Sequence, residues 1–139
     1  SIGASRTLMA CLVEAYHEEE VKGEKRVVMR FHPRIAPIKA AILPLVKRDG
    51  MPEVAHKITE DLRPHFPVFY DEGGAIGRRY RRMDEVGTPF CITVDSQTLE
   101  DQTVTVRERD SMAQDRVAIP ELRAEIGRRM ETWKHPDEG

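Results

Sequence analysis

The sequence IKAAILPL occupies residues 38–45 and is the part of the chain that decides its fold. A run this short and this apolar is typical of a strand that is covered on both faces of its sheet. A helix is predicted next, over residues 51–66, because Val54, Ile58 and Leu62 recur at every fourth position and form one apolar stripe. A buried strand followed by an amphipathic helix is the unit from which α/β domains are built.

Elements of the same two kinds flank this unit. Four further strands are predicted from apolar or alternating runs, over residues 26–31, 67–71, 89–95 and 103–108. Three further helices are predicted, over residues 7–20, 76–83 and 120–133. Residues 97–102 are polar and are predicted to form a turn. This order of strands and helices predicts a mixed sheet with helices packed on it.

The composition is that of one folded domain. The chain has 139 residues, of which 40% are hydrophobic and 33% are charged, a balance that excludes a disordered chain. The formal net charge is -2, so a nucleic-acid-binding function would need local basic clusters and not an overall positive field. No apolar run approaches the length of a membrane span and no signal peptide is recognisable, so a cytoplasmic location is expected.

The cysteine and histidine residues indicate no specific chemistry. Cys11 and Cys91 lie far apart among apolar neighbours, which predicts two buried free thiols, with a disulfide or a catalytic thiol as the alternative. The five histidines are scattered, and none stands at metal-ligand spacing from Cys or Asp. No metal site is therefore predicted.

The densest signal for a ligand is the sequence GRRYRR at residues 77–82. On a helix, Arg78, Arg81 and Arg82 share one face, because residues three and four positions apart are neighbours. Arginine donates paired hydrogen bonds to phosphates and base edges, and Tyr80 adds a ring on which a base can stack. The alternative is a solvated helix face that is balanced by nearby carboxylates. Four like charges this close together repel one another unless an anion joins them, which favours the ligand.

Two further groups of charged residues suit an RNA surface. Arg107 and Arg109 point to the same side of a predicted strand, near the basic helix, with a strand-end lattice of ion pairs as the alternative. The carboxylates of Asp84, Glu85 and Asp95 can accept hydrogen bonds from base amino groups. They could also form a general acid–base pair, but no nucleophile or metal triad accompanies them, and ion pairing to nearby arginines is the ordinary alternative.

The sequence Gly3-Ala4-Ser5-Arg6 stands at the head of the first predicted helix. A glycine, a hydroxyl group and an arginine at a helix N-terminus form a plausible phosphate-binding corner. The alternative is an ordinary helix cap followed by a surface arginine.

The sequence GRRYRRMDEVGTPF at residues 77–90 resembles the signature of the anticodon-binding domain of glycyl-tRNA synthetase. Further blocks match that domain in order, at residues 36–39, 93–95, 98–101 and 107–112. The resemblance is close over about residues 34–122. It implies a mixed sheet of about five strands with helices on both faces, binding of the anticodon loop of glycine tRNA, and no cofactor or metal bound by the domain itself.

The resemblance also implies which residues contact the anticodon. By matching position, the first candidates are Arg78, Glu85 and Arg109, and the next are Arg79, Arg82, Asp84, Asp95 and Arg107. We expect their two main segments, 76–83 and 106–110, to converge into one open patch. Two positions depart from the family: Met83 stands where Gln is usual, and Ser96 stands where Phe or Tyr is usual. A missing ring at residue 96 would remove a stacking contact of about 1–3 kcal/mol.

The head of the chain resembles the end of the third signature motif of class II synthetases. By that resemblance Gly3, Ala4, Ser5 and Arg6 contact ATP in the parent enzyme, although many members have Asp at the position of Ser5. The implied organisation is a helical remnant of the catalytic domain at 1–25, the anticodon-binding domain at 26–135 and a disordered tail at 136–139.

The implied parent enzyme ligates glycine to tRNA with ATP and Mg, and is a homodimer. Its partners are the tRNA and its own catalytic domain, with no membrane or DNA, and this chain alone is expected to be inactive. Two alternatives are a non-enzymatic interaction module on a synthetase-like fold, such as a polymerase accessory subunit, and a self-contained ATP-using enzyme centred on Arg6.

Overall fold

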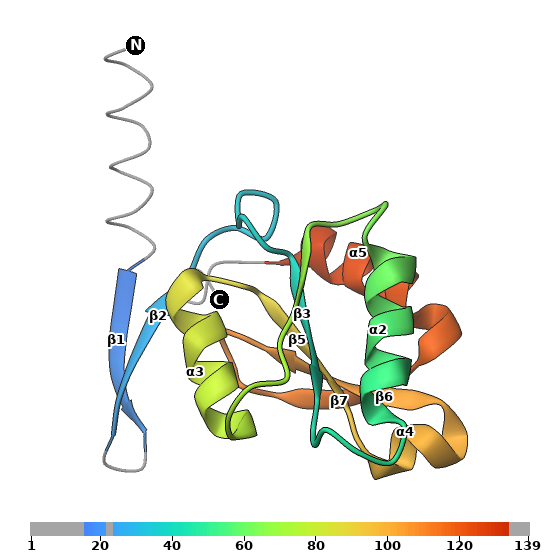
Figure 1. The fold of residues 1–139 in the computed structure, drawn as a ribbon. Coiled ribbons are helices and arrows are strands. Elements are labelled where there is room, and N and C mark those ends of the chain that lie inside the picture. Colours follow the sequence, from blue (N-terminus) through green and yellow to red (C-terminus); the bar gives the residue numbers. More distant parts are fainter. Residues whose placement is uncertain (1–15, 22–23, 134–139) are drawn as a thin grey trace.

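The computed structural model describes residues 16–21 and 24–133, and its centre is a five-stranded sheet (Figure 1). The strands lie in the order β4-β3-β5-β6-β7. Their bounds are β3 Ala40–Pro44, β4 Val68–Tyr70, β5 Phe90–Val94, β6 Thr103–Glu108 and β7 Gln114–Ala118. Strands β4, β3 and β5 are parallel, whereas β6 and β7 are antiparallel to their neighbours. The predicted mixed sheet of about five strands is confirmed.

Helices cover both faces of this sheet (Figure 1). Helix α2 (Met51–Leu62) connects β3 to β4, and helix α3 (Ile76–Val86) connects β4 to β5. Because β4 and β5 lie on opposite sides of β3, two crossovers of the same hand place α2 and α3 on opposite faces. The last helix, α5 (Leu122–Thr132), follows a 3-10 turn at Ile119–Glu121 and packs on the face that α2 covers.

The core has a large part beneath α2 and α5 and a small part beneath α3. Every residue of β3 is buried, as predicted for a strand covered on both faces. Ala40 and Ile42 point into the large cluster, while Ala41 and Leu43 point toward α3 and join Met83 in the small one. Strand residues alternate between faces, so this division follows from the pleat of the sheet.

The predicted helix at 7–20 is wrong from Tyr16 onward. Strand β1 (Tyr16–Val21) pairs antiparallel with β2 (Glu24–Met29), and residues 7–15 lie outside the described residues. The register of this hairpin runs from Tyr16 opposite Met29 to Val21 opposite Glu24. The predicted domain boundary between residues 25 and 26 therefore falls inside β2.

Two elements near the β7 edge of the sheet, a short helix and the edge strand itself, differ from the prediction. Residues 97–102, predicted as a turn, belong largely to helix α4 (Ser96–Asp101). A capping box begins this helix: the Asp95 carboxylate accepts from the Thr98 amide, and the Thr98 hydroxyl accepts from the Asp95 amide. Strand β7 was not predicted, because it is a polar edge strand whose residues are at most half-buried.

Cys91 is buried with a free thiol, as predicted, whereas Cys11 lies outside the described residues. Removal from solvent raises the pKa of the Cys91 thiol to about 12. Within 16–21 and 24–133, no helix has the length and apolar character needed to cross a membrane.

Candidate nucleic-acid interface

A row of charged side chains lies on the side of α3 that faces away from the sheet. We call it the α3 row; its members are Arg78, Arg81, Arg82 and Glu85. Together with the Gly73–Gly74 turn they line an open hollow of 490 Å³. Arg82 Nη2 donates to the Gly73 carbonyl (2.7 Å), which ties the row to this turn. Three of the four members are exposed, and Arg81 is half-buried. The row can therefore offer its charges to an anionic ligand.

Arg79 points the other way and is part of the interior. Its side chain is 1% exposed. Nη1 donates to the carbonyls of Pro44 (2.6 Å) and Asp71 (3.0 Å), and Nη2 donates to that of Leu45 (3.2 Å). These carbonyls lie at the carboxyl end of β3 and just beyond β4. Arg79 therefore fixes the start of α3 against the sheet, where its burial lowers the pKa of the guanidinium.

Asp84 is fully buried between two arginines from distant parts of the chain. Arg26 Nε, from β2, donates to Oδ2 (3.0 Å), and Arg107, from β6, donates to both carboxylate oxygens (3.0 and 3.2 Å). The guanidinium of Arg107 also lies over the Tyr80 ring, 4.7 Å from its centre. Burial acts to lower the pKa of Arg107, but its hydrogen bonds to Asp84 prevail, so the pKa is raised. This ion-pair network joins β2, α3 and β6.

Arg109, two residues beyond Arg107 in the chain, joins the same three regions. It is 1% exposed and donates to the carbonyls of Gly87 (2.9 Å) and Phe31 (2.7 Å). Its own carbonyl accepts from Arg26 Nη2, and its side chain pairs with Asp110. Arg109 therefore fixes the chain that follows β2 to the C-terminal end of α3.

The predicted open patch is corrected by these contacts. Helix α3 and the end of β6 do come together, as expected. However, α3 and the chain that follows β2 cover the end of β6. Four of the eight predicted residues are consequently interior groups with internal partners: Arg79, Asp84, Arg107 and Arg109. Met83, one of the two departures from the family, is also interior and is 5% exposed.

A second polar surface lies where α3 does not cover the sheet. We call it the strand patch; it consists of Asp95, Thr103, Thr105 and Arg116, on β6, β7 and the cap of α4. The patch exists because the alternate residues Val104, Val106 and Val117 point to the opposite face, into the large core cluster. The members from β6 and β7 are half-buried or exposed. Arg116 was missed from the sequence, since its strand was not predicted.

Arg116 and Asp95 form the centre of the strand patch. Arg116 Nη1 donates to Asp95 Oδ2 (2.9 Å) and Nη2 donates to Oδ1 (3.0 Å), so the ion pair is bidentate. The side chains are 31% and 22% exposed. Hydrogen bonding from Arg116 lowers the pKa of the Asp95 carboxyl and raises the pKa of the guanidinium.

Replacing Arg116 by glutamine should raise the pKa of Asp95 toward its ordinary value of 3.8, because the first cause of the lowering is removed. The ion pair stabilises the fold above the unfolded-state pKa, and this stabilisation is lost as pH falls through the lower folded-state pKa. Carboxyl ¹³C NMR titration of both proteins measures the shift. Glu125 is the internal control, since hydrogen bonds from Arg128 and Arg129 are the main causes of its lowered pKa. An unchanged Asp95 titration would contradict the assigned cause.

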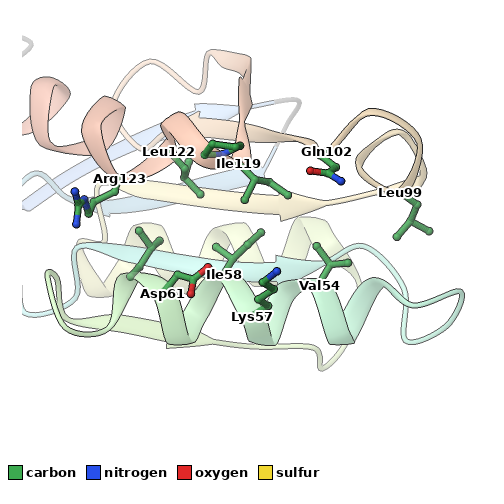
Figure 2. A pocket seen from close by; sticks show the side chains of 11 residues that line it. Val54, Lys57, Ile58, Asp61, Leu99, Gln102, Ile119, Leu122 and Arg123 are labelled. Atoms are coloured by element: carbon green, nitrogen blue, oxygen red, sulfur yellow. The ribbon is translucent and has the colours of Figure 1, made fainter.

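An apolar groove of 570 Å³ lies on the opposite face, between α2 and the segment that leads into α5 (Figure 2). Val54, Ile58, Ile119 and Leu122 point into it, and Lys57, Asp61 and Arg123 stand at its rim. None of the predicted contact residues lines this groove. It therefore plays no part in the candidate interface.

The predicted ATP contacts, Gly3, Ala4, Ser5 and Arg6, lie outside the described residues. The described part of the chain contains no group of three His, Cys, Asp or Glu side chains that could hold a metal ion.

Comparison with known proteins assigns the family. The Anticodon binding domain family matches residues 39–129. Two similar proteins are the glycine–tRNA ligases of Rhodopirellula baltica, 56% identical over 135 residues, and Clostridium perfringens, 55% identical over 136 residues. Each alignment covers 94% of this chain but only 25% and 29% of the relative, so the chain spans about a quarter of their length.

The solved structures that resemble this chain show the same fold. A prolyl-tRNA synthetase from Cryptosporidium parvum superposes with a TM-score of 0.69 at 22% identity, over 74% of this chain and 22% of that one. At this identity the likeness concerns the fold alone. With the family match and the close relatives, the conclusion is that the chain belongs to the anticodon-binding domain family and is similar to the domains found in glycine–tRNA ligases.

Proposed function

We propose that this chain holds the anticodon loop of glycine tRNA as the recognition module of a glycine–tRNA ligase. The observation that carries the proposal is the α3 row, three arginines beside an open hollow within the part of the chain that matches the family. Phosphate groups are the ligands best suited to such a row, since each arginine can donate paired hydrogen bonds. A domain with a net charge of -2 needs local cations of this kind.

The predicted contact residues divide into two roles. Arg78 and Arg82 are exposed and suit the RNA backbone, while Glu85 and Asp95 can accept hydrogen bonds from the amino groups of cytosine. The buried residues are positioning residues: they hold α3 and the strands in place, and are Arg79, Asp84, Arg107 and Arg109.

The catalytic activity belongs to the larger protein in this proposal. The relatives are about four times as long as the matched segment, so the chain alone is expected to have no ligase activity. The full enzyme would use ATP with Mg in its catalytic domain and act as a homodimer.

Replacing Arg78 by alanine tests the proposal. We expect weaker binding of glycine tRNA, with the slope of log affinity against log salt reduced by about 1, because one phosphate contact is lost. Titration of labelled tRNA over a range of salt concentrations measures both quantities. Arg63→Ala is the control, since it removes an exposed arginine just beyond the C-terminal end of α2, on the other face of the sheet.

Two results would contradict the proposal. One is equal affinity of the wild-type chain for glycine tRNA and for a non-cognate tRNA. The other is an Arg78→Ala variant that binds like the Arg63→Ala control. Indifference to the anticodon combined with capture of a protein partner would favour the alternative of a non-enzymatic interaction module.

A further inference from the structure

The guanidinium of Arg116 has a partner for every one of its donors. Besides the two bonds to Asp95, Nε donates to Thr103 Oγ1 (2.9 Å), Nη1 to Thr105 Oγ1 (3.2 Å) and Nη2 to the Thr103 carbonyl (3.0 Å). A guanidinium carries five N–H donors, all of which lie in its plane. The five bonds therefore occupy its whole edge and hold the plane in one orientation on the sheet.

With all five in-plane donors bound, a ligand can approach the guanidinium of Arg116 only over one of its faces. The side chain is 31% exposed although its donors are all bound. An arginine in this state has no donor left for a phosphate or for the edge of a base. The interaction it can still make is stacking, because unpaired RNA bases stack on guanidinium planes as they do on aromatic rings.

We propose that the exposed face of the Arg116 guanidinium is a stacking platform for one unpaired base of the anticodon loop. The proposal rests on the function proposed above and assigns a residue of the strand patch to it. A positive charge on the platform suits an RNA ligand, and it adds a cation–π contribution to the stack.

The neighbouring residue offers no competing platform. Ser96 is exposed and directly follows Asp95, the carboxylate that holds Arg116. Its small side chain has no plane on which a base can stack, so Arg116 supplies the plane on this patch.

Arg116→Lys tests the platform because it keeps the charge and removes the plane. The probe is a glycine-tRNA anticodon stem-loop in which 2-aminopurine replaces one loop base at a time. With the wild-type chain, stacking should quench the fluorescence at one loop position. The variant should lose this quenching and bind about 5- to 150-fold more weakly, the range typical of one base stack, with an unchanged salt slope.

Two matched variants separate stacking from other causes. Arg123→Lys makes the same change at the rim of the apolar groove on the other face and should bind like wild type. Arg116→Trp removes all the hydrogen bonds to Asp95 but restores a plane. It should therefore recover the quenching, with an unchanged salt slope because Arg116 makes no phosphate contact. An abasic nucleotide at the quenched position should abolish the difference between wild type and Arg116→Lys.

The outcomes distinguish this inference from the proposed function. If wild type and Arg116→Lys bind the stem-loop equally with the same fluorescence, the platform is overturned while anticodon binding stands. If Arg116→Trp behaves like Arg116→Lys, the loss comes from the broken Asp95 contacts and the platform is again overturned. If the wild-type chain does not bind the stem-loop at all, the platform and the proposed function both fail.

Discussion

Replacing Asp84 by asparagine should lower the free energy of unfolding by about 3–5 kcal/mol, the range found when one partner of a buried ion pair is removed. Asp84 is fully buried and is the shared acceptor for Arg26 and Arg107. Asparagine keeps the shape but leaves two interior guanidinium groups facing a neutral amide. Urea denaturation monitored by circular dichroism measures the loss.

The adjacent residue supplies the control for this experiment. Glu85 is exposed on the same helix, so Glu85→Gln should change the free energy of unfolding by no more than about 0.5 kcal/mol. The two variants make the same chemical change at neighbouring positions and differ mainly in burial. Equal stability of the two would show that the Asp84 network does not stabilise the fold.

Gly87→Ala should destabilise the protein more than Gly50→Ala, although both glycines have a left-handed backbone, with φ of 83° and 84°. Any side chain at either position costs about 1–2 kcal/mol for that conformation. A Cβ at Gly87 would also lie 2.8 Å from Phe31 Cε2 and 2.9 Å from the Met29 carbonyl, whereas a Cβ at Gly50 would meet nothing within 4 Å.

The expected difference between these two alanine variants is about 1–3 kcal/mol, the usual cost of overpacking. Thermal or urea unfolding of both proteins measures it. Equal stability of the two variants would mean that the chain following β2 moves away from the end of α3 without cost. The close approach at Gly87 would then contribute nothing to the position of the hairpin.

The sequence predicted the elements whose side chains carry a clear pattern. Strand β3 is buried on both faces and has an apolar run, and α2 has an apolar stripe, so both could be located. Strand β7 lies at the edge of the sheet and is mostly polar, which leaves no periodicity to detect. Helix α4 is short, and its main local signal is the capping pair of Asp95 and Thr98.

The candidate interface could be predicted only where helical spacing decided which way a side chain points. The α3 row follows from positions three and four apart on one helix. The burial of Arg107 and Arg109 does not follow from local sequence, because it depends on α3 and on the chain that follows β2. Arginine is rarely interior unless it is paired, and the partner of Arg26, Asp84, lies 58 residues away in the chain.

We expect the contact between β2 and α3 to decide where the smallest autonomously folding polypeptide begins. The family match begins at residue 39, and a fragment cut there would still contain all five strands of the central sheet. Such a fragment would lack Arg26 and the carbonyl of Phe31, so Asp84 would lose one of its two arginine partners and Arg109 would lose one of its acceptors. We therefore expect the autonomous folding unit to begin upstream of the segment that matches the family, no later than β2.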